Sequence, residues 1–345
     1  MSLNGVLFRA TAGAWHRGSP LGALPGDAWG GALGSLGGMP EMPEVETVRR
    51  RLAPLLEGRL FSDVEISDAR LTRPFDPVLV ARELDGERVQ SLGRRGKYLL
   101  INFESGRSLV VHLRMTGSLL HIPDGGKTSG DKSRADTSEA AAATGETAGT
   151  TSVVSLPDQL HRRAVVILDD GTTLVYNDVR RFGTWLLLEP GEADLYIDER
   201  VGPEPLEPNF GARHLGERLA HRRAPVKAVL LDQKALAGVG NIYADEALWR
   251  AKLHPLTPAD SLTPAELRAL HRSVRRALEQ GLARQGSTLR DYRLPDGGTG
   301  EMQHEFKVYG RDGEPCDRCG TPIDKIRVAG RGTWYCPTCQ IQRPL

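Results

Sequence analysis

The first strong hydrophobic periodicity in the chain is that of a helix. Two Met-Pro-Glu triplets, residues 39–41 and 42–44, precede apolar residues spaced three and four positions apart: Val45, Val48, Leu52, Leu55 and Leu56. This spacing places the apolar side chains on one face of a helix. Pro43 suits the first turn, where a missing N–H costs little, and Gly58 fits the end of the helix.

Four short apolar runs then predict β-strands, because they are rich in branched and aromatic residues and are bounded by turn-forming residues. The runs are Tyr98–Phe103, Ser108–Met115, Ala164–Leu168 and Thr172–Tyr176. The triplet 169–171, Asp-Asp-Gly, separates the last two runs and predicts a hairpin turn. Residues 124–155, between the second and third runs, are small and polar and have no period. We interpret them as a disordered insertion.

The second half of the chain has a helical pattern from about residue 212. Residues 263–266, Thr-Pro-Ala-Glu, have the composition of a capping box with proline in the first turn. One apolar stripe follows, consisting of Leu267, Leu270, Val274, Leu278 and Leu282. We interpret it as the core face of a long helix. The order along the chain is therefore a β-rich domain, a helical domain and a small terminal module.

The composition is that of an ordinary globular protein. The chain has 345 residues, of which 39% are hydrophobic and 26% charged, and this length suggests two or three domains. No apolar run approaches the roughly 18 residues of a membrane span, so we expect no membrane partner. The net charge of +1 exerts no general attraction on polyanions, and nucleic-acid binding would therefore need local basic patches.

Residues 1–38 differ from the rest of the chain. They are rich in Gly, Ala and Leu, and Gly, Pro, Asp and His interrupt every candidate signal sequence. We interpret them as a disordered extension upstream of the true start of the protein. All four cysteines lie in the last 30 residues, so no disulfide framework runs through the chain. A reducing compartment is therefore expected.

The cysteines form two Cys-x-x-Cys pairs separated by sixteen residues: Cys316, Cys319, Cys336 and Cys339. Four thiolates with this spacing can occupy the corners of a tetrahedron, so we expect one structural Zn²⁺ per chain. The alternative is a pair of disulfides or four unrelated thiols. A zinc module would present its basic residues on a rigid hairpin, and among them Arg331 lies in a Gly-flanked turn.

The segment 237–243, Ala-Gly-Val-Gly-Asn-Ile-Tyr, predicts a tight turn before a helix that begins near Asn241. It lacks the third glycine and the preceding strand of a dinucleotide site. A helix N-terminus offers free N–H groups, so a DNA phosphate could bind there, with Arg222, Arg223 and Lys227 just upstream. The alternative is an ordinary helix hairpin.

Several motifs together resemble a known family. In chain order they are MPEMPEVETVRR, RRGKYLL, HLRMTGSL, DVRRFGTWL, AGVGNIYADEAL, VYGRDGEPC and RGTWYCPTCQ. The chain resembles bacterial formamidopyrimidine-DNA glycosylase over residues 39–345, apart from the insertion. The resemblance implies a multidomain α+β fold. Its expected parts are a catalytic β-sandwich domain (39–210), a helix-two-turn-helix domain that binds DNA (211–300) and a zinc-finger module (301–345).

The resemblance also implies a bifunctional enzyme of base-excision repair. Such an enzyme removes oxidised purines (8-oxoguanine and formamidopyrimidines) from duplex DNA and then cleaves the strand by β,δ-elimination. By this match Pro40 is the nucleophile, Glu41 its acidic partner, and Lys97 and Arg331 assist catalysis. An α-amine titrates near ~8, about two units below a lysine side chain, so a free Pro40 amine could attack the sugar and form an iminium ion.

A base inside a duplex must be extruded before it can be cut out. The resemblance assigns Met115, Arg180 and Phe182 to a wedge that fills the gap in the base stack; without it, Met115 and Phe182 would be interpreted as core. The residues matched to phosphate contacts are His161, Arg180, Arg222 and Asn241. Arg114 stands where the family pattern favours a small residue.

The expected partner is damaged double-stranded DNA, and the expected form is a monomer in the bacterial cytoplasm, acting at the nucleoid. Two alternatives stay open. One is an endonuclease VIII-like glycosylase for oxidised pyrimidines. The other is a non-catalytic DNA-binding protein, because Pro40 of a chain that begins at Met1 is an internal tertiary amide without a free lone pair.

Overall fold

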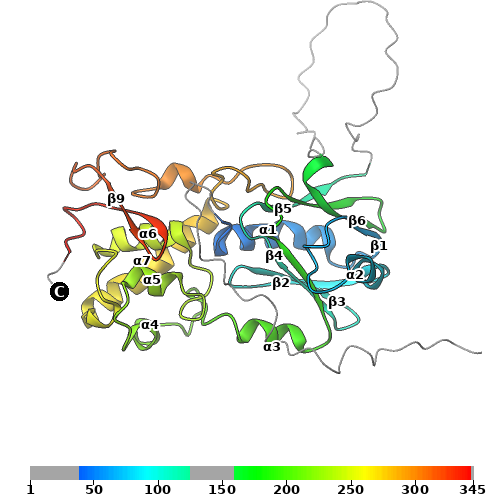
Figure 1. Ribbon diagram of the computed structural model, residues 1–345, viewed down its shortest axis with the longest axis horizontal. Helices are drawn as coiled ribbons and strands as arrows, with labels where there is room; N and C mark the ends of the chain where they lie inside the picture. Colours follow the sequence, from blue (N-terminus) through cyan, green and yellow to red (C-terminus); the bar gives the residue numbers. More distant parts are fainter. Residues whose placement is uncertain (1–38, 125–158, 343–345) are drawn as a thin grey trace, which may run out of the picture. The chain divides into compact units, whose positions relative to one another are not determined.

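The computed structural model describes residues 39–124 and 159–342 (Figure 1). The expected extension, residues 1–38, lies outside the described residues, and so does the expected insertion beyond residue 124. None of the described helices is both long enough and apolar enough to cross a membrane.

Two four-stranded antiparallel sheets form the first part of the fold. Their strand orders are β1-β6-β7-β5 and β2-β3-β4-β8. The strands are β1 (Phe61–Ile66), β2 (Val89–Arg95), β3 (Tyr98–Phe103), β4 (Ser108–His112), β5 (Gly117–Ile122), β6 (Arg162–Leu168), β7 (Thr173–Asp178) and β8 (Thr184–Leu188). The helical elements beside them are α1 (Met42–Leu56), α2 (Pro77–Leu84), the 3₁₀ turn η2 (Gln159–His161) and α3 (Glu192–Asp198).

The two sheets share one hydrophobic core, which confirms the expected sandwich. Phe61 of the first sheet meets Phe103 of the second edge to face, with ring centroids 5.4 Å apart. Val48 and Leu52 of α1 belong to the same core. Apolar residues of α3 cover the outer face of β4 and β8. Strands buried on both faces do not alternate polar and apolar residues.

Burial or charge explains why the sequence pattern did not predict three strands of the sandwich. β5 is buried at five of its six positions, and β1 and β2 carry charged residues within short runs, so none has a clear period of two. The strand predicted for Ser108–Met115 ends earlier, at His112. Arg114 has a φ of 53°, which turns the chain out of the strand. A non-glycine residue adopts this left-handed conformation at some cost, and a small residue is therefore favoured there.

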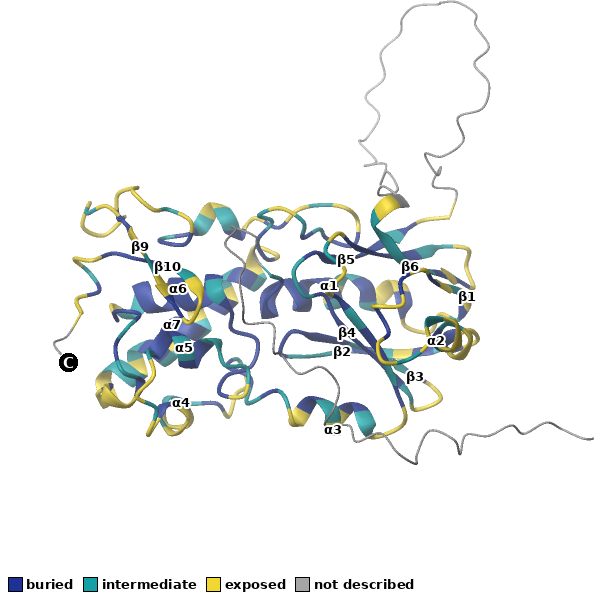
Figure 2. Ribbon diagram, viewed as in Figure 1, coloured by how far each residue is buried: buried dark blue, intermediate teal, exposed yellow. Residues whose placement is uncertain are grey.

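The second part of the described chain is helical. Its elements are α4 (Ala212–Leu219), α5 (Val226–Leu231), α6 (Asn241–Ala251), η3 (Ala259–Ser261), α7 (Pro264–Ala283) and η4 (Met302–Glu305). α7 begins as predicted: Thr263 Oγ1 accepts a hydrogen bond from the N–H of Glu266, and Leu270, Val274 and Leu278 are buried. Figure 2 shows that α6 is buried along most of its length.

The cysteine module packs on these helices. Its two strands are β9 (Asp324–Val328) and β10 (Arg331–Tyr335). Ile323 and Trp334 share a hydrophobic core with Leu248 of α6. Met42, in the first turn of α1, belongs to this core as well, whereas the rest of the apolar face of α1 belongs to the sandwich. The start of α1 is therefore packed between the helices and the sheets.

Candidate active site

Pro40 is buried immediately before α1. Glu41 occupies the N-cap of this helix, and its backbone N–H donates to Oε2 of Glu44 at 3.0 Å. Glu44 is itself buried, and its Oε1 accepts the hydroxyl of Tyr243 at 2.8 Å and the N–H of Ser287 at 2.8 Å. The segment that begins at Pro40 is thus fixed by groups from distant parts of the chain.

The Glu41 carboxylate lies at the N-terminus of α6. Its Oε2 accepts the N–H of Gly240 at 2.6 Å and its Oε1 accepts the N–H of Ile242 at 2.8 Å. The prediction that a DNA phosphate binds these N–H groups is therefore wrong. A carboxylate of the same chain satisfies them, because the positive end of a helix attracts any anion that reaches it.

The glycines of segment 237–243 make this close approach possible. A Cβ on Gly240 would lie 2.3 Å from Cδ of Glu41, and a Cβ on Gly238 would lie 2.5 Å from Cβ of Met42. Gly238 also accepts the N–H of Met42 through its carbonyl, at 3.0 Å. The Gly-x-Gly pattern serves the contact between two segments of the chain and not a nucleotide phosphate.

Lys97 is buried, with 5% of its surface exposed, and it interacts electrostatically with the buried Glu41. Burial lowers the pKa of Lys97, the Glu41 carboxylate opposes this shift, and the Arg331 guanidinium adds to it. Burial also raises the pKa of Glu41 to about 7, although Lys97 opposes this second shift. Burial therefore shifts the pKa values of this acid and this amine toward each other, and their mutual attraction opposes both shifts.

Glu204, which the sequence analysis did not identify, holds the turn that carries Lys97. Its two carboxylate oxygens accept Nη1 and Nη2 of Arg94 at 2.9 and 3.0 Å, and one of them also accepts the N–H of Gly96. Glu204 is 4% exposed. An isolated glutamate between two prolines has no periodicity that would have predicted this contact.

Arg331 approaches Lys97 from the far end of the chain. It is exposed at the start of β10, directly after the tight turn formed by Ala329 and Gly330. The turn has the positive φ values of 48° and 74° at its two central residues, as expected for a β-hairpin. The effect of Arg331 on the pKa of Lys97 places its charge within electrostatic range of the buried pair.

A buried ion pair positions this hairpin. Lys227 is fully buried, and its ammonium lies 2.7 Å from Oδ1 of Asp245 and 2.7 Å from Oγ1 of Thr333. It also donates to the carbonyl of Gly332, which accepts Nδ2 of Asn241 as well. The interpretation of Lys227 as part of a basic patch for phosphate is therefore wrong. Asn241 remains a predicted DNA contact that also holds the hairpin.

The other predicted phosphate contacts lie elsewhere on the described surface. Arg222 is 40% exposed and pairs with Asp232 at 2.7 Å, so an incoming phosphate would compete with this carboxylate. His161 ends η2, immediately before β6, and is partly buried. Their contact with DNA remains a prediction.

The three predicted wedge residues come together from two loops. Nη1 of Arg180 donates to Sδ of Met115 at 3.1 Å, and its guanidinium carbon lies 5.0 Å from the centroid of the Phe182 ring. Phe182 is 42% exposed, so the alternative that it is a core residue is wrong. An exposed aromatic ring beside a cation and a thioether could stack on a base.

The four cysteines can hold one metal ion. Their Sγ atoms all lie within 4.8 Å of one another, and none is in a disulfide. Cys316 Sγ accepts Nε1 of Trp249 and Cys336 Sγ accepts the N–H of Cys339, both at 3.4 Å. Such donors favour the thiolate form, and a four-thiolate set suits Zn²⁺. Four protein ligands leave no open position for water, so the metal would be structural.

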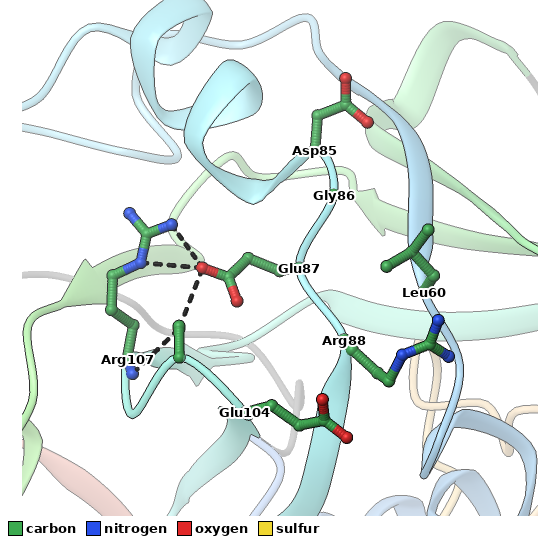
Figure 3. Close-up of a pocket in the computed structure, with 8 residues that line it drawn as sticks. Leu60, Asp85, Gly86, Glu87, Arg88, Glu104 and Arg107 are labelled. Atoms are coloured by element: carbon green, nitrogen blue, oxygen red, sulfur yellow. Dashed lines mark hydrogen bonds and ion pairs between the residues drawn. The ribbon is translucent and has the colours of Figure 1, made fainter. Parts of the chain in front are cut away.

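A separate pocket lies at one edge of the sandwich (Figure 3). It is lined by Leu60, Asp85, Gly86, Glu87, Arg88, Glu104, Ser105 and Arg107. Nε of Arg107 donates to Oε1 of Glu87 at 2.9 Å, so these two charges neutralise each other. None of the predicted site residues lines this pocket.

Comparison with known proteins agrees with this arrangement. Three family models match: the formamidopyrimidine-DNA glycosylase N-terminal domain (39–185), its H2TH domain (201–293) and the zinc finger found in FPG and IleRS (313–341). Formamidopyrimidine-DNA glycosylase of Chloroflexus aurantiacus is 43% identical over 303 residues, which are 88% of this chain and 98% of the relative.

Solved structures are similar over the same extent. The MutM (FPG) protein of Thermus thermophilus is 41% identical, with a TM-score of 0.70, and the match covers 88% of this chain and all of the other. The Fpg protein of Lactococcus lactis in complex with Fapy-dG-containing DNA is 34% identical, with a TM-score of 0.73 and the same coverage.

Replacing Gly240 by alanine should separate Glu41 from α6. The new Cβ would overlap the carboxyl group, so hydrogen bonds to a buried charge would be lost. Each such bond contributes about 1.5–3 kcal/mol, and we expect the free energy of unfolding to fall by at least about 2 kcal/mol in a denaturant titration. Gly211→Ala is the matched control, because no atom lies within 4 Å of its Cβ position. The control should change the free energy of unfolding by less than about 1 kcal/mol; equal losses would contradict the assigned role of Gly240.

Replacing Cys336 by serine should remove zinc and weaken binding to duplex DNA together, since the module holds the hairpin that carries Arg331. Zinc content and DNA affinity are measured on the same preparation. Thr338→Ser, in the same cysteine pair but with an exposed side chain, should change neither. A variant that lacks zinc and still binds DNA normally would show that the module has no part in binding.

Proposed function

We propose that this chain, which belongs to the formamidopyrimidine-DNA glycosylase family, removes oxidised purines from double-stranded DNA and then cleaves the strand at the resulting abasic site. The observation that carries the proposal is the burial of Glu41, the residue that follows Pro40, together with Lys97, with which it interacts electrostatically. The Arg331 guanidinium, from a third segment of the chain, lies within electrostatic range of Lys97.

We propose that the active form begins at Pro40. The N-terminal family model begins at residue 39, and the matched relative aligns over 98% of its own length. Removal of Met39 would free a secondary amine at Pro40. Its lone pair would form a bond to C1′ of the damaged nucleotide. The glycosidic C1′–N bond would break at the same time, and the base would leave with the electron pair of that broken bond.

The buried pair would manage the protons of this reaction. Glu41, with its pKa raised to about 7, can be protonated or ionised at neutral pH, and it could therefore protonate the opening sugar ring and later accept a proton. Lys97 adds positive charge next to the departing base and the phosphate. Arg331 would then stabilise the phosphates that leave during β- and δ-elimination.

Binding and base extrusion would use the surface residues. His161, Arg180, Arg222 and Asn241 would contact phosphates, and such contacts make DNA affinity fall with salt. Met115, Arg180 and Phe182 would fill the space that the extruded base leaves. The Lactococcus lactis relative, solved with Fapy-dG-containing DNA and with DNA that contains an oxidised pyrimidine, supports an oxidised base in DNA as the substrate. We further propose a monomer that acts in the bacterial cytoplasm.

An endonuclease VIII-like preference for oxidised pyrimidines is the second candidate within this reaction class. Side-by-side excision from duplexes that carry 8-oxoguanine or an oxidised pyrimidine separates the two. We expect the purine to be removed faster, because the curated relatives that match along nearly their full length are formamidopyrimidine-DNA glycosylases.

Protein that starts at Met39 should form a covalent adduct with duplex DNA containing 8-oxoguanine in the presence of borohydride. It should also release the base and nick the strand, because Pro40 then has a free amine. The full chain, with an intact Met1 verified by mass spectrometry, should bind the same DNA without being trapped. Gel electrophoresis of the reduced adduct measures the difference.

Pro40→Gly in the Met39-start protein is the matched variant, since glycine still presents a primary amine. We expect trapping at a greatly reduced rate but above zero. Robust trapping by an intact Met1 protein would show that Pro40 is not the nucleophile and would point to Lys97. A Met39-start protein that binds DNA and is never trapped would favour a non-catalytic protein.

A further inference from the structure

We propose that Thr116 and Asp178 are positioning residues that hold the two wedge loops together in one conformation. The loops are residues 113–116, between β4 and β5, and residues 179–183, between β7 and β8. The proposal rests on the proposed function, since it assumes that Met115, Arg180 and Phe182 enter the base stack.

One hydroxyl joins the two loops. Thr116 follows Met115 directly and is 7% exposed. Its Oγ1 accepts the backbone N–H of Arg180 at 2.9 Å and donates its own hydrogen to Oδ1 of Asp178. The same atom thus connects the loop that carries Met115 with the loop that carries Arg180, and both of its hydrogen-bonding roles are used.

Asp178 precedes the second loop and binds the residue at its other end. Its side chain is 1% exposed, and its Oδ2 accepts the N–H of Gly183 at 2.7 Å. The carboxylate therefore connects both ends of the loop 179–183 and leaves Arg180 and Phe182 between them. Position 183 admits no side chain, since a Cβ there would lie 1.7 Å from the hydroxyl of Tyr176. A buried carboxylate is retained only where hydrogen bonds compensate its desolvation.

Arg181 anchors the middle of this loop. It has a φ of 61°, and its Nε and Nη2 donate to Oδ2 and Oδ1 of Asp68 at 2.5 and 2.7 Å. Asp68 is 3% exposed. A non-glycine residue keeps such a backbone conformation only when its surroundings fix it. With Arg181 tied to Asp68, its two neighbours, Arg180 and Phe182, are left to form the cation–π pair beside Met115.

This network has a consequence for the reaction. A wedge must be in place as the base leaves the stack, and side chains ordered in advance lose less entropy at that step. Loss of the Thr116 hydroxyl should therefore slow base extrusion more than it weakens DNA binding. A substrate whose base is already missing should be affected least.

The test compares Thr116→Val with Thr116→Ser in the Met39-start protein. Valine keeps the shape and removes the hydroxyl, whereas serine keeps the hydroxyl. We expect Thr116→Val to lower the single-turnover excision rate of 8-oxoguanine about tenfold and to slow the fluorescence rise of a 2-aminopurine placed beside the lesion. Thr116→Ser should restore both rates to within about twofold of the parent. Cleavage of a preformed abasic site should change less than about threefold in either variant.

Thr72→Val controls for the loss of a buried hydroxyl in the same domain, because Thr72 is fully buried and donates to the carbonyl of Phe75 at 3.0 Å. It should leave the fluorescence rise unchanged. Asp178→Asn, which weakens the same network from its other member, should reproduce the Thr116→Val result. If Thr116→Val does not fold, Thr116→Ala removes the hydroxyl without added volume and takes its place.

The outcomes separate this inference from the proposed function. If Met115→Ala slows the fluorescence rise and Thr116→Val does not, the wedge assignment stands and the positioning role is overturned. The positioning role would also be overturned if Thr116→Val lowered the rate of 8-oxoguanine excision and the rate of abasic-site cleavage equally. The same holds if Thr116→Ser did not restore the excision rate. If the parent protein excises no base at all, the proposed function itself fails.

Discussion

The contact on which the rest of the site depends is the Glu41 carboxylate against the N-terminus of α6. It joins the residue that follows Pro40 to a helix that begins two hundred residues later in the chain. Because the carboxylate accepts backbone N–H groups and not side chains, the geometry is set by the path of the main chain. A change in the relative position of α1 and α6 would break two charge-assisted hydrogen bonds at once.

Burial of this carboxylate has an electrostatic cost that shapes the chemistry. Burial raises the pKa of Glu41 to about 7, although the nearby Lys97 favours the ionised form. Burial lowers the pKa of Lys97, because it disfavours the charged amine, and the Glu41 carboxylate opposes this shift. Each group therefore opposes the effect of burial on the charge of the other. Such a pair contributes little to stability, because desolvation offsets its attraction, and shifted pKa values of this kind are what the proton transfer proposed above would need.

Local patterns predicted the parts of this fold that depend on neighbouring residues. The helix α1, the capped start of α7 and the four-cysteine module follow from spacing within a few residues or a known ligand set. The contacts of Glu204 with Arg94 and of Lys227 with Thr333 could not be predicted in this way, because these partners lie 110 and 106 residues away. Both charges would ordinarily be placed on the surface. Phe182 is the opposite case, an aromatic ring that a local pattern assigns to the core and that is exposed.

Other buried carboxylates of the described chain resemble Glu41, because they also accept backbone N–H groups from a remote segment. Asp245 accepts the N–H of Trp334 at 3.1 Å. Glu246 accepts three successive N–H groups, from Lys307, Val308 and Tyr309, at 2.8–3.1 Å. Glu44 accepts the N–H of Ser287 in the same manner.

Each of these carboxylates would be costly to bury alone and is retained because the remote segment supplies its hydrogen bonds. A hydrophobic contact tolerates sliding, whereas a carboxylate that accepts specific N–H groups does not. The segment that begins at Pro40, the hairpin that carries Arg331 and the loops that carry Met115 and Phe182 come from separate parts of the chain. Hydrogen bonds of this kind fix each of them more closely than hydrophobic contacts alone would, and the proposed reaction would depend on such accuracy.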